Sequence, residues 1–94
     1  MAGHFRIVTT PAFEREFRKA AKGNPALAHA LEELLTILED DPYNRTGRHQ
    51  VKKLVGLQPG EGQWRIRWRE YRLRYDIFSD QGVLHSFRHR REAY

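Results

Sequence analysis

The chain contains no cysteine, so it can form neither a disulfide bond nor a thiolate zinc site. It has no apolar run close to the ~20 residues that span a bilayer, and its N-terminus lacks the pattern of a signal peptide. The histidines lack metal-ligand spacing, and the glycines do not form a phosphate-binding loop. From these absences we expect a cytoplasmic protein that requires no membrane, metal or other cofactor.

The length of 94 residues predicts one domain, residues 1–94, with a single modest core. Charge is unevenly distributed along this domain. Residues 1–50 carry seven Lys/Arg and seven Asp/Glu, whereas residues 51–94 carry ten Lys/Arg against five Asp/Glu, which accounts for the whole net charge of +5. A neutral half followed by a basic half favours an anionic partner, with nucleic acid as the first candidate and an acidic protein as the second.

The most informative stretch runs from Gln63 to Phe78 and reads WRIRWREYRLRYDIF from Trp64. Apolar and charged residues alternate strictly on both sides of Glu70, which predicts two strands joined by a tight turn. Successive side chains of a strand point to opposite faces, so one face is apolar and the other carries five arginines. We expect Trp64 and Trp68 to pack in the core, because they alternate with the arginines.

The remaining elements follow from cap and turn signals. A strand is expected over His4–Thr9, and Thr10-Pro11 and Asn24-Pro25 each supply a capping residue and a first-position proline for a helix. The first helix stops at Gly23 and the second near Glu39. A polar loop at 43–50 precedes strands at Val51–Leu57 and, beyond the alternating stretch, at Val83–Phe87. The predicted class is α+β: a two-helix hairpin on one face of a mostly antiparallel sheet of about four to five strands, in the order β-α-α-β-β-β-β.

This order of elements, together with KKLVGL, QWRIRWREYRLRYDI and the closing HRREAY, resembles the RelE/ParE superfamily of toxins from toxin–antitoxin modules. The resemblance covers nearly the whole chain and is greater to the RelE branch. It implies a RelE-like toxin domain that inhibits translation as a ribosome-dependent, metal-independent messenger RNA endoribonuclease. It also implies a cognate antitoxin, the ribosome and messenger RNA as partners, and a possible higher-order toxin–antitoxin complex.

We expect two sets of functional residues, of which the resemblance implies the first. The catalytic set is Arg65, Arg67, Arg72, Arg90 (or its neighbour Arg91) and Tyr94. The RNA-binding set is Lys52, Lys53, Arg74, Arg88, His89 and Arg91. Arg65 and Arg67 occupy positions where relatives commonly carry lysine. The opposing interpretation of the arginine face is that it pairs with surface acids, namely Glu61, Glu70 and Asp76.

In the implied reaction, a 2′-hydroxyl attacks the adjacent phosphate and leaves a 2′,3′-cyclic phosphate. Arginine side chains suit the stabilisation of the phosphate charge, but they stay protonated and cannot accept the proton of the hydroxyl. We therefore expect Tyr94 to act as the base, with His89 and His85 as alternatives.

Two other functions fit the same residues. A ParE-like toxin would inhibit DNA gyrase and leave messenger RNA intact. A non-catalytic RNA- or ribosome-binding module would show salt-sensitive binding without cleavage.

Overall fold

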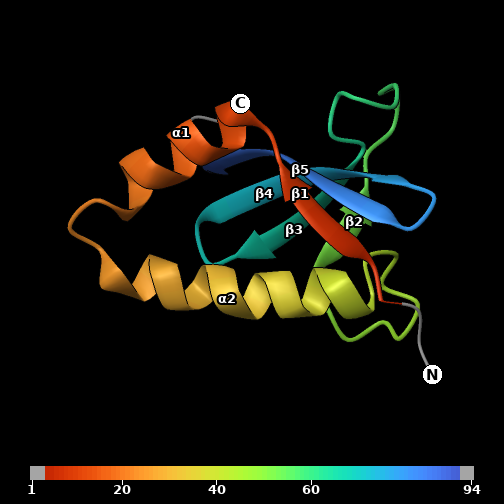
Figure 1. Ribbon diagram of the computed structural model, residues 1–94, viewed down its shortest axis with the longest axis horizontal. Helices are drawn as coiled ribbons and strands as arrows, with labels where there is room; N and C mark the ends of the chain where they lie inside the picture. Colours follow the sequence, from red (N-terminus) through yellow and green to blue (C-terminus); the bar gives the residue numbers. More distant parts are fainter. Residues whose placement is uncertain (1–3, 92–94) are drawn as a thin grey trace.

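The computed structural model describes residues 4–91, which form two helices and a five-stranded sheet. The elements are β1 (Arg6–Thr9), α1 (Pro11–Ala21), α2 (Pro25–Asp40), β2 (Val51–Lys53), β3 (Trp64–Trp68), β4 (Tyr71–Phe78) and β5 (Gln81–His89). The strands lie in the order β1-β5-β4-β3-β2, and only the β1–β5 pair is parallel. This architecture confirms the predicted fold class (Figure 1).

The helices begin where the sequence predicts, but their caps differ. At α1 the Thr10 side chain accepts a hydrogen bond of 3.0 Å from Phe13 N, and the helix is followed by Gly23 in the left-handed region with φ +72°. The side chain of Asn24 makes no such bond at α2, so that part of the prediction is wrong. The backbone oxygen of Asn24 accepts from Leu27 N instead. The proline at the first position is therefore the effective start signal of α2.

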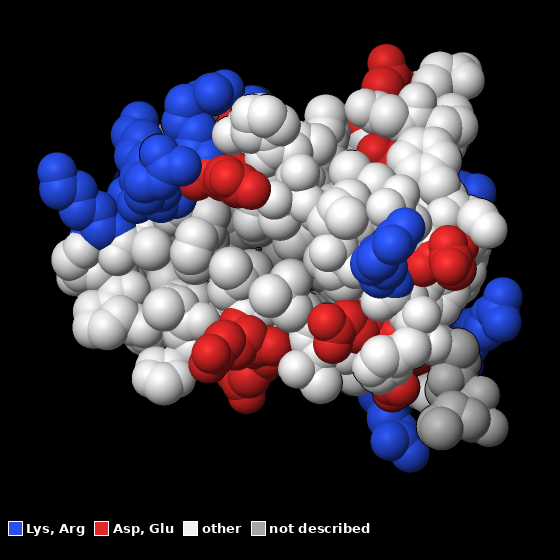
Figure 2. Space-filling view, viewed as in Figure 1, with Lys and Arg blue, Asp and Glu red and all other residues white. Residues whose placement is uncertain are grey.

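The charges of the two helices differ, and this difference is visible on the surface. Lys and Arg gather over α1, whereas Asp and Glu gather along α2, and the surface between them is largely uncharged (Figure 2). Neither helix of the described chain is long and apolar enough to cross a membrane.

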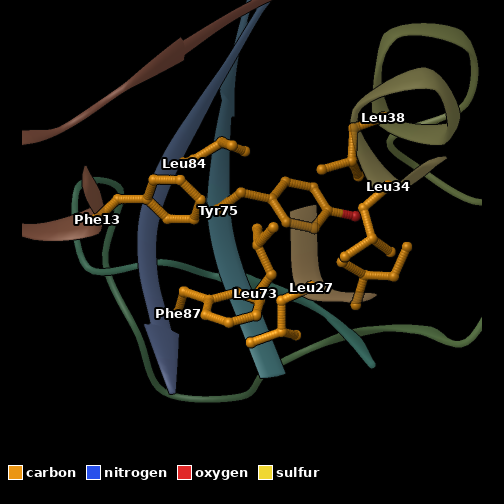
Figure 3. Packing of buried hydrophobic residues seen from close by; sticks show 9 residues of the cluster. Phe13, Leu27, Leu34, Leu38, Leu73, Tyr75, Leu84 and Phe87 are labelled. Carbon is orange, nitrogen blue, oxygen red and sulfur yellow. The ribbon is translucent and has the colours of Figure 1, made fainter. Parts of the chain in front are cut away.

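The core lies between the helices and the apolar face of the sheet, where side chains from α1, α2 and strands β3–β5 interdigitate (Figure 3). Its members are Phe13, Leu27, Leu34, Leu38, Ile66, Leu73, Tyr75, Leu84 and Phe87. Trp64 and Trp68 pack against this cluster, as predicted. The hydroxyl of Tyr75 donates to Pro42 O at 2.7 Å, and burial together with the negative charge of Asp41 raises the pKa of this phenol.

β1 begins at Arg6 rather than His4, and two other strands differ more in extent from the prediction. β2 ends at Lys53 rather than Leu57, and the chain then leaves the sheet in a loop, residues 54–63, that returns through a bond from Leu54 N to Gln63 O. β5 is longer than predicted and contains an irregularity. Arg74 pairs with Ser86 while Tyr75 pairs with Leu84, so His85 is the additional residue of a β-bulge. The bulge allows both Leu84 and Phe87 to face the core.

Candidate functional site

The pairing of the strands arranges the basic residues in two rows across one face of the sheet. The first row follows the partners Lys52, Arg65, Arg74 and Ser86, and the second follows Arg67, Arg72 and Arg88. Like charges directly opposite each other destabilise a sheet. A face with this composition is therefore suited to a polyanion, whose binding would relieve the repulsion.

A pocket of about 200 Å³ opens on this face, and none of the acidic residues within 4–91 lines it. The lining residues come from β3, β4, β5 and the start of the 54–63 loop: Leu54, Arg65, Arg72, Arg74, His85, Ser86 and Arg88. Four arginines around so small a volume match one phosphate-sized anion in charge and size, because forked guanidinium donors fit the oxygens of a phosphate.

In the pocket, Arg65 is the clearest example of a side chain with a hydrogen-bond donor left unused. Its Nε atom is buried and has no hydrogen-bond partner among residues 4–91. A buried donor without a partner costs about 1–3 kcal/mol, so folding alone does not explain its position. Arg65 also lines the pocket, so its side chain lies beside the space that an anion would occupy.

Arg67 and Arg74 are held in place by neutral oxygens. Arg67 donates from Nε and Nη2 to Gln50 Oε1 at 3.3 and 3.0 Å. Arg74 donates to Gly62 O at 3.1 Å and to Glu61 O at 2.5 Å. Because these acceptors carry no net charge, both guanidinium groups keep their full positive charge while their orientation is fixed.

Asp76 is 2% exposed and accepts bonds of 3.0–3.1 Å from Gly62 N and Gln63 N. The opposing interpretation, in which Asp76 pairs with the arginine face, does not describe this arrangement: Asp76 accepts from the N–H of Gly62, and Arg74 donates to the carbonyl of the same residue. The Glu61 carboxylate accepts from Gln58 N. Within residues 4–91, the arginines Arg65, Arg67 and Arg74 form no ion pair with these acids.

The arginines of the chain end lie differently. Arg88 reaches the rim of the pocket, and its Nε forms a 2.9 Å ion pair with Glu16 of α1, whose other oxygen accepts from Phe87 N. Arg90 lies at the β3–β4 turn, where its side chain is 3.1 Å from Glu70. Arg91 lies beside Glu16 and Lys19 in a hollow at the end of α1.

The other sequence-predicted residues are dispersed. The ammonium of Lys53 lies 5.7 Å from the ring centre of Trp64, its cross-strand partner, whereas Lys52 pairs with Arg65. His89 packs edge-on against Tyr71 and lies 3.8 Å from Glu70. Tyr94 lies outside the described residues.

The structure adds residues that the sequence analysis did not assign to the site. Ser86 and Leu54 line the pocket, and His85, named only as an alternative base, also lies there. The signal for this arrangement was the separation of three between Leu84 and Phe87. Two apolar residues three apart in a strand share a face only if a bulge lies between them. No three His, Asp or Glu side chains within residues 4–91 are grouped so that they could hold a metal ion.

Comparison with known proteins identifies the family. The model of the ParE toxin of the type II toxin–antitoxin system, parDE, matches residues 7–94. The chain belongs to the ParE toxin family. This membership confirms the predicted RelE/ParE superfamily. No curated protein matches the sequence significantly.

A solved structure matches the fold of this ParE-family chain. It is the RelB–RelE antitoxin–toxin complex from Methanococcus jannaschii, with a TM-score of 0.63 and 19% sequence identity. The match covers 93% of this chain and 94% of the other. The fold is thus shared with a chain of this toxin–antitoxin complex over almost the entire length of both.

Proposed function

We propose that this toxin is an endoribonuclease that cleaves messenger RNA on the ribosome and binds the scissile phosphate in the arginine-lined pocket. The observation that supports this proposal is the composition of the pocket in the described part of the chain: four arginines, one of them with an unpartnered buried Nε, and no acid. The likeness to a RelE protein in fold is consistent with it.

The pocket has the groups that a phosphoryl-transfer reaction needs for charge stabilisation. Attack of a 2′-hydroxyl on the adjacent phosphate concentrates negative charge on the phosphate oxygens. Arg65, Arg72 and Arg74 project from neighbouring strands of a rigid sheet, so their donors are oriented before the substrate arrives. Removal of one oriented donor of this kind typically lowers a rate by ~10²–10³.

The ribosome and an antitoxin complete the proposal. The ribosome would orient the messenger, and orientation alone contributes ~7–11 kcal/mol in favourable cases. The antitoxin would be an acidic protein that neutralises the toxin by covering the basic face. The related RelE structure was solved as a complex with its antitoxin.

A translating extract tests the activity. The purified protein is added together with a reporter messenger, and the ends of the messenger are mapped. We expect new 3′ ends that carry a 2′,3′-cyclic phosphate, and a large loss of cleavage in the Arg72→Ala variant. Arg15→Ala is the matched control, because Arg15 is an exposed arginine of α1 away from the pocket. An intact messenger in the presence of folded wild-type protein contradicts the proposal.

Inhibition of DNA gyrase is the second candidate, favoured by the match to the ParE family model over residues 7–94. It predicts loss of supercoiling and broken DNA in a purified gyrase assay while the messenger stays intact. The same protein preparation therefore separates the two activities when it is assayed in parallel.

A further inference from the structure

We propose that His85 is the catalytic proton acceptor of the pocket, an inference that rests on the ribonuclease activity proposed above. The nearby groups that could compete for this role are limited. The pocket is lined by four arginines, Leu54, Ser86 and His85. Arginine and leucine cannot accept a proton, and a serine hydroxyl is a poor base near neutral pH. Among the lining residues that the structure describes, the imidazole is the one group suited to the task.

The backbone explains how the imidazole reaches the basic face. In a regular strand, His85 would alternate with Leu84 and Ser86, and Phe87 would share its face. The bulge opposite Arg74 and Tyr75 breaks this alternation, so Leu84 and Phe87 are both buried while His85 joins the arginines. Bulges commonly redirect a side chain beside an active site.

The loop that precedes β3 fixes the position of the ring. A Cβ atom on Gly62 would lie 3.0 Å from His85 Cδ2 and 3.1 Å from Arg74 Cβ, so another residue here would crowd the imidazole, and the φ of +78° also favours glycine. The two bonds to Asp76 and Arg74 hold Gly62 itself in place. The wall against which the ring packs is therefore rigid, as general acid–base catalysis requires.

The ring nitrogens of His85 are available for the reaction. Within the part of the chain that the structure describes, they form no hydrogen bond or ion pair, whereas His29, His49 and His89 each lie near a carboxylate. The charged groups that surround His85 are Arg65 from β3, Arg72 and Arg74 from β4, and Arg88 from β5.

The reaction step is a transfer within the RNA with a balanced exchange of protons. The 2′-oxygen forms a bond to phosphorus while its proton passes to the imidazole of His85. The bond between phosphorus and the 5′-oxygen breaks, and the 5′-oxygen takes a proton from water. The products are a 2′,3′-cyclic phosphate and a 5′-hydroxyl end, and the imidazolium returns its proton to the solvent.

The decisive experiment compares His85→Gln with the wild-type protein and with His29→Gln, a matched control on the exposed side of α2. Single-turnover cleavage is measured on ribosomes programmed with a short messenger, between pH 5.5 and 8.5. We expect His85→Gln to lower the rate by ~10²–10⁴ and to abolish its rise with pH. Affinity for the same ribosomes carrying an uncleavable messenger, with a 2′-deoxynucleotide at the cleavage site, should remain unchanged.

A second variant separates chemistry from folding. In His85→Ala, added free imidazole should restore part of the cleavage, which a purely structural role of the histidine would not allow. The inference is overturned if wild-type protein cleaves and His85→Gln cleaves equally fast, or if His89→Gln alone removes the dependence on pH. If folded wild-type protein leaves the messenger intact, the proposed function fails and the role of His85 fails with it.

Discussion

Asp76 on β4 and Arg65 on β3 are charged side chains of adjacent strands, yet the fold uses their hydrogen-bonding groups in opposite ways. Asp76 is 2% exposed, and backbone N–H groups of the returning loop satisfy its carboxylate. Arg65 has a buried Nε without a partner in residues 4–91. Buried polar groups are almost always hydrogen-bonded when stability alone determines their environment. The contrast therefore indicates a role in folding for Asp76, and it is the reason why we propose a role in binding for Arg65.

The comparison extends to the rest of the charged residues. Asp41 resembles Asp76, because it accepts bonds from Arg45 N, Thr46 N and the hydroxyl of Thr46 in the loop after α2. Both acids organise loops through backbone donors, and neither lies in the pocket. The acidic side chains of the interior thus stabilise the loops, and the arginine face is left positively charged.

The largest expected effect is on Arg65. Arg65→Met keeps most of the apolar stem and removes the guanidinium, so we expect cleavage to fall ~10²–10³. The free energy of unfolding should rise by about 1 kcal/mol, because the variant no longer buries an unpaired donor. Single-turnover cleavage and urea unfolding measure the two quantities, with Arg15→Met as the control. A loss of stability would show that Arg65 is a structural residue.

Asp76→Asn should have the opposite effect on stability. Replacement of a buried, charged acceptor weakens the bonds from Gly62 N and Gln63 N, and we expect a loss of about 2–3 kcal/mol in the free energy of unfolding. Urea unfolding measures it. The exposed Asp80→Asn is the matched control and should change stability by less than about 0.5 kcal/mol. Equal stability of the two variants contradicts the role given to Asp76.

Local signals in the sequence were sufficient to predict the helices and the two faces of the sheet. Thr10-Pro11 and Gly23 mark α1, and the alternation from Trp64 onward identifies the strands that carry the arginines. These features depend on caps and on side-chain period, both of which act within a few residues. The prediction of the basic face followed directly from them.

The pocket itself depends on contacts between distant residues, which local patterns do not reveal. Asp76 and Gly62 are 14 residues apart, and their bond brings the loop against His85. Glu16 and Arg88 are 72 residues apart, and their ion pair joins α1 to β5. The early end of β2 and the bulge in β5 likewise reflect tertiary packing, which overrides the local strand preference of VKKLVGL.

Asp41 offers a smaller effect that depends on pH. Burial opposes its ionisation, but the bonds from Thr46 and Arg45 and the proximity of His49 outweigh it and lower the pKa of the carboxyl below its usual value. A lowered pKa in the folded state stabilises the protein above the unfolded-state value of about 4. We expect Asp41→Asn to lose about 1–2 kcal/mol at pH 7, and the difference from wild type to shrink as pH falls below about 4. Urea unfolding at pH 3, 5 and 7 measures this difference, which should not grow on acidification.

The smallest effect is expected for the ion pair between Arg90 and Glu70 at the β3–β4 turn. Both side chains are more than half exposed, at 56% and 54%, so water and salt screen their attraction. A double-mutant cycle with Arg90→Ala and Glu70→Ala should give a coupling of about 0.2–1 kcal/mol in the free energy of unfolding. High salt should reduce this coupling further. A coupling as large as the loss expected for Asp76→Asn would mean that exposed pairs of this sheet stabilise the fold as strongly as its buried acids, and the division between folding acids and binding arginines would no longer hold.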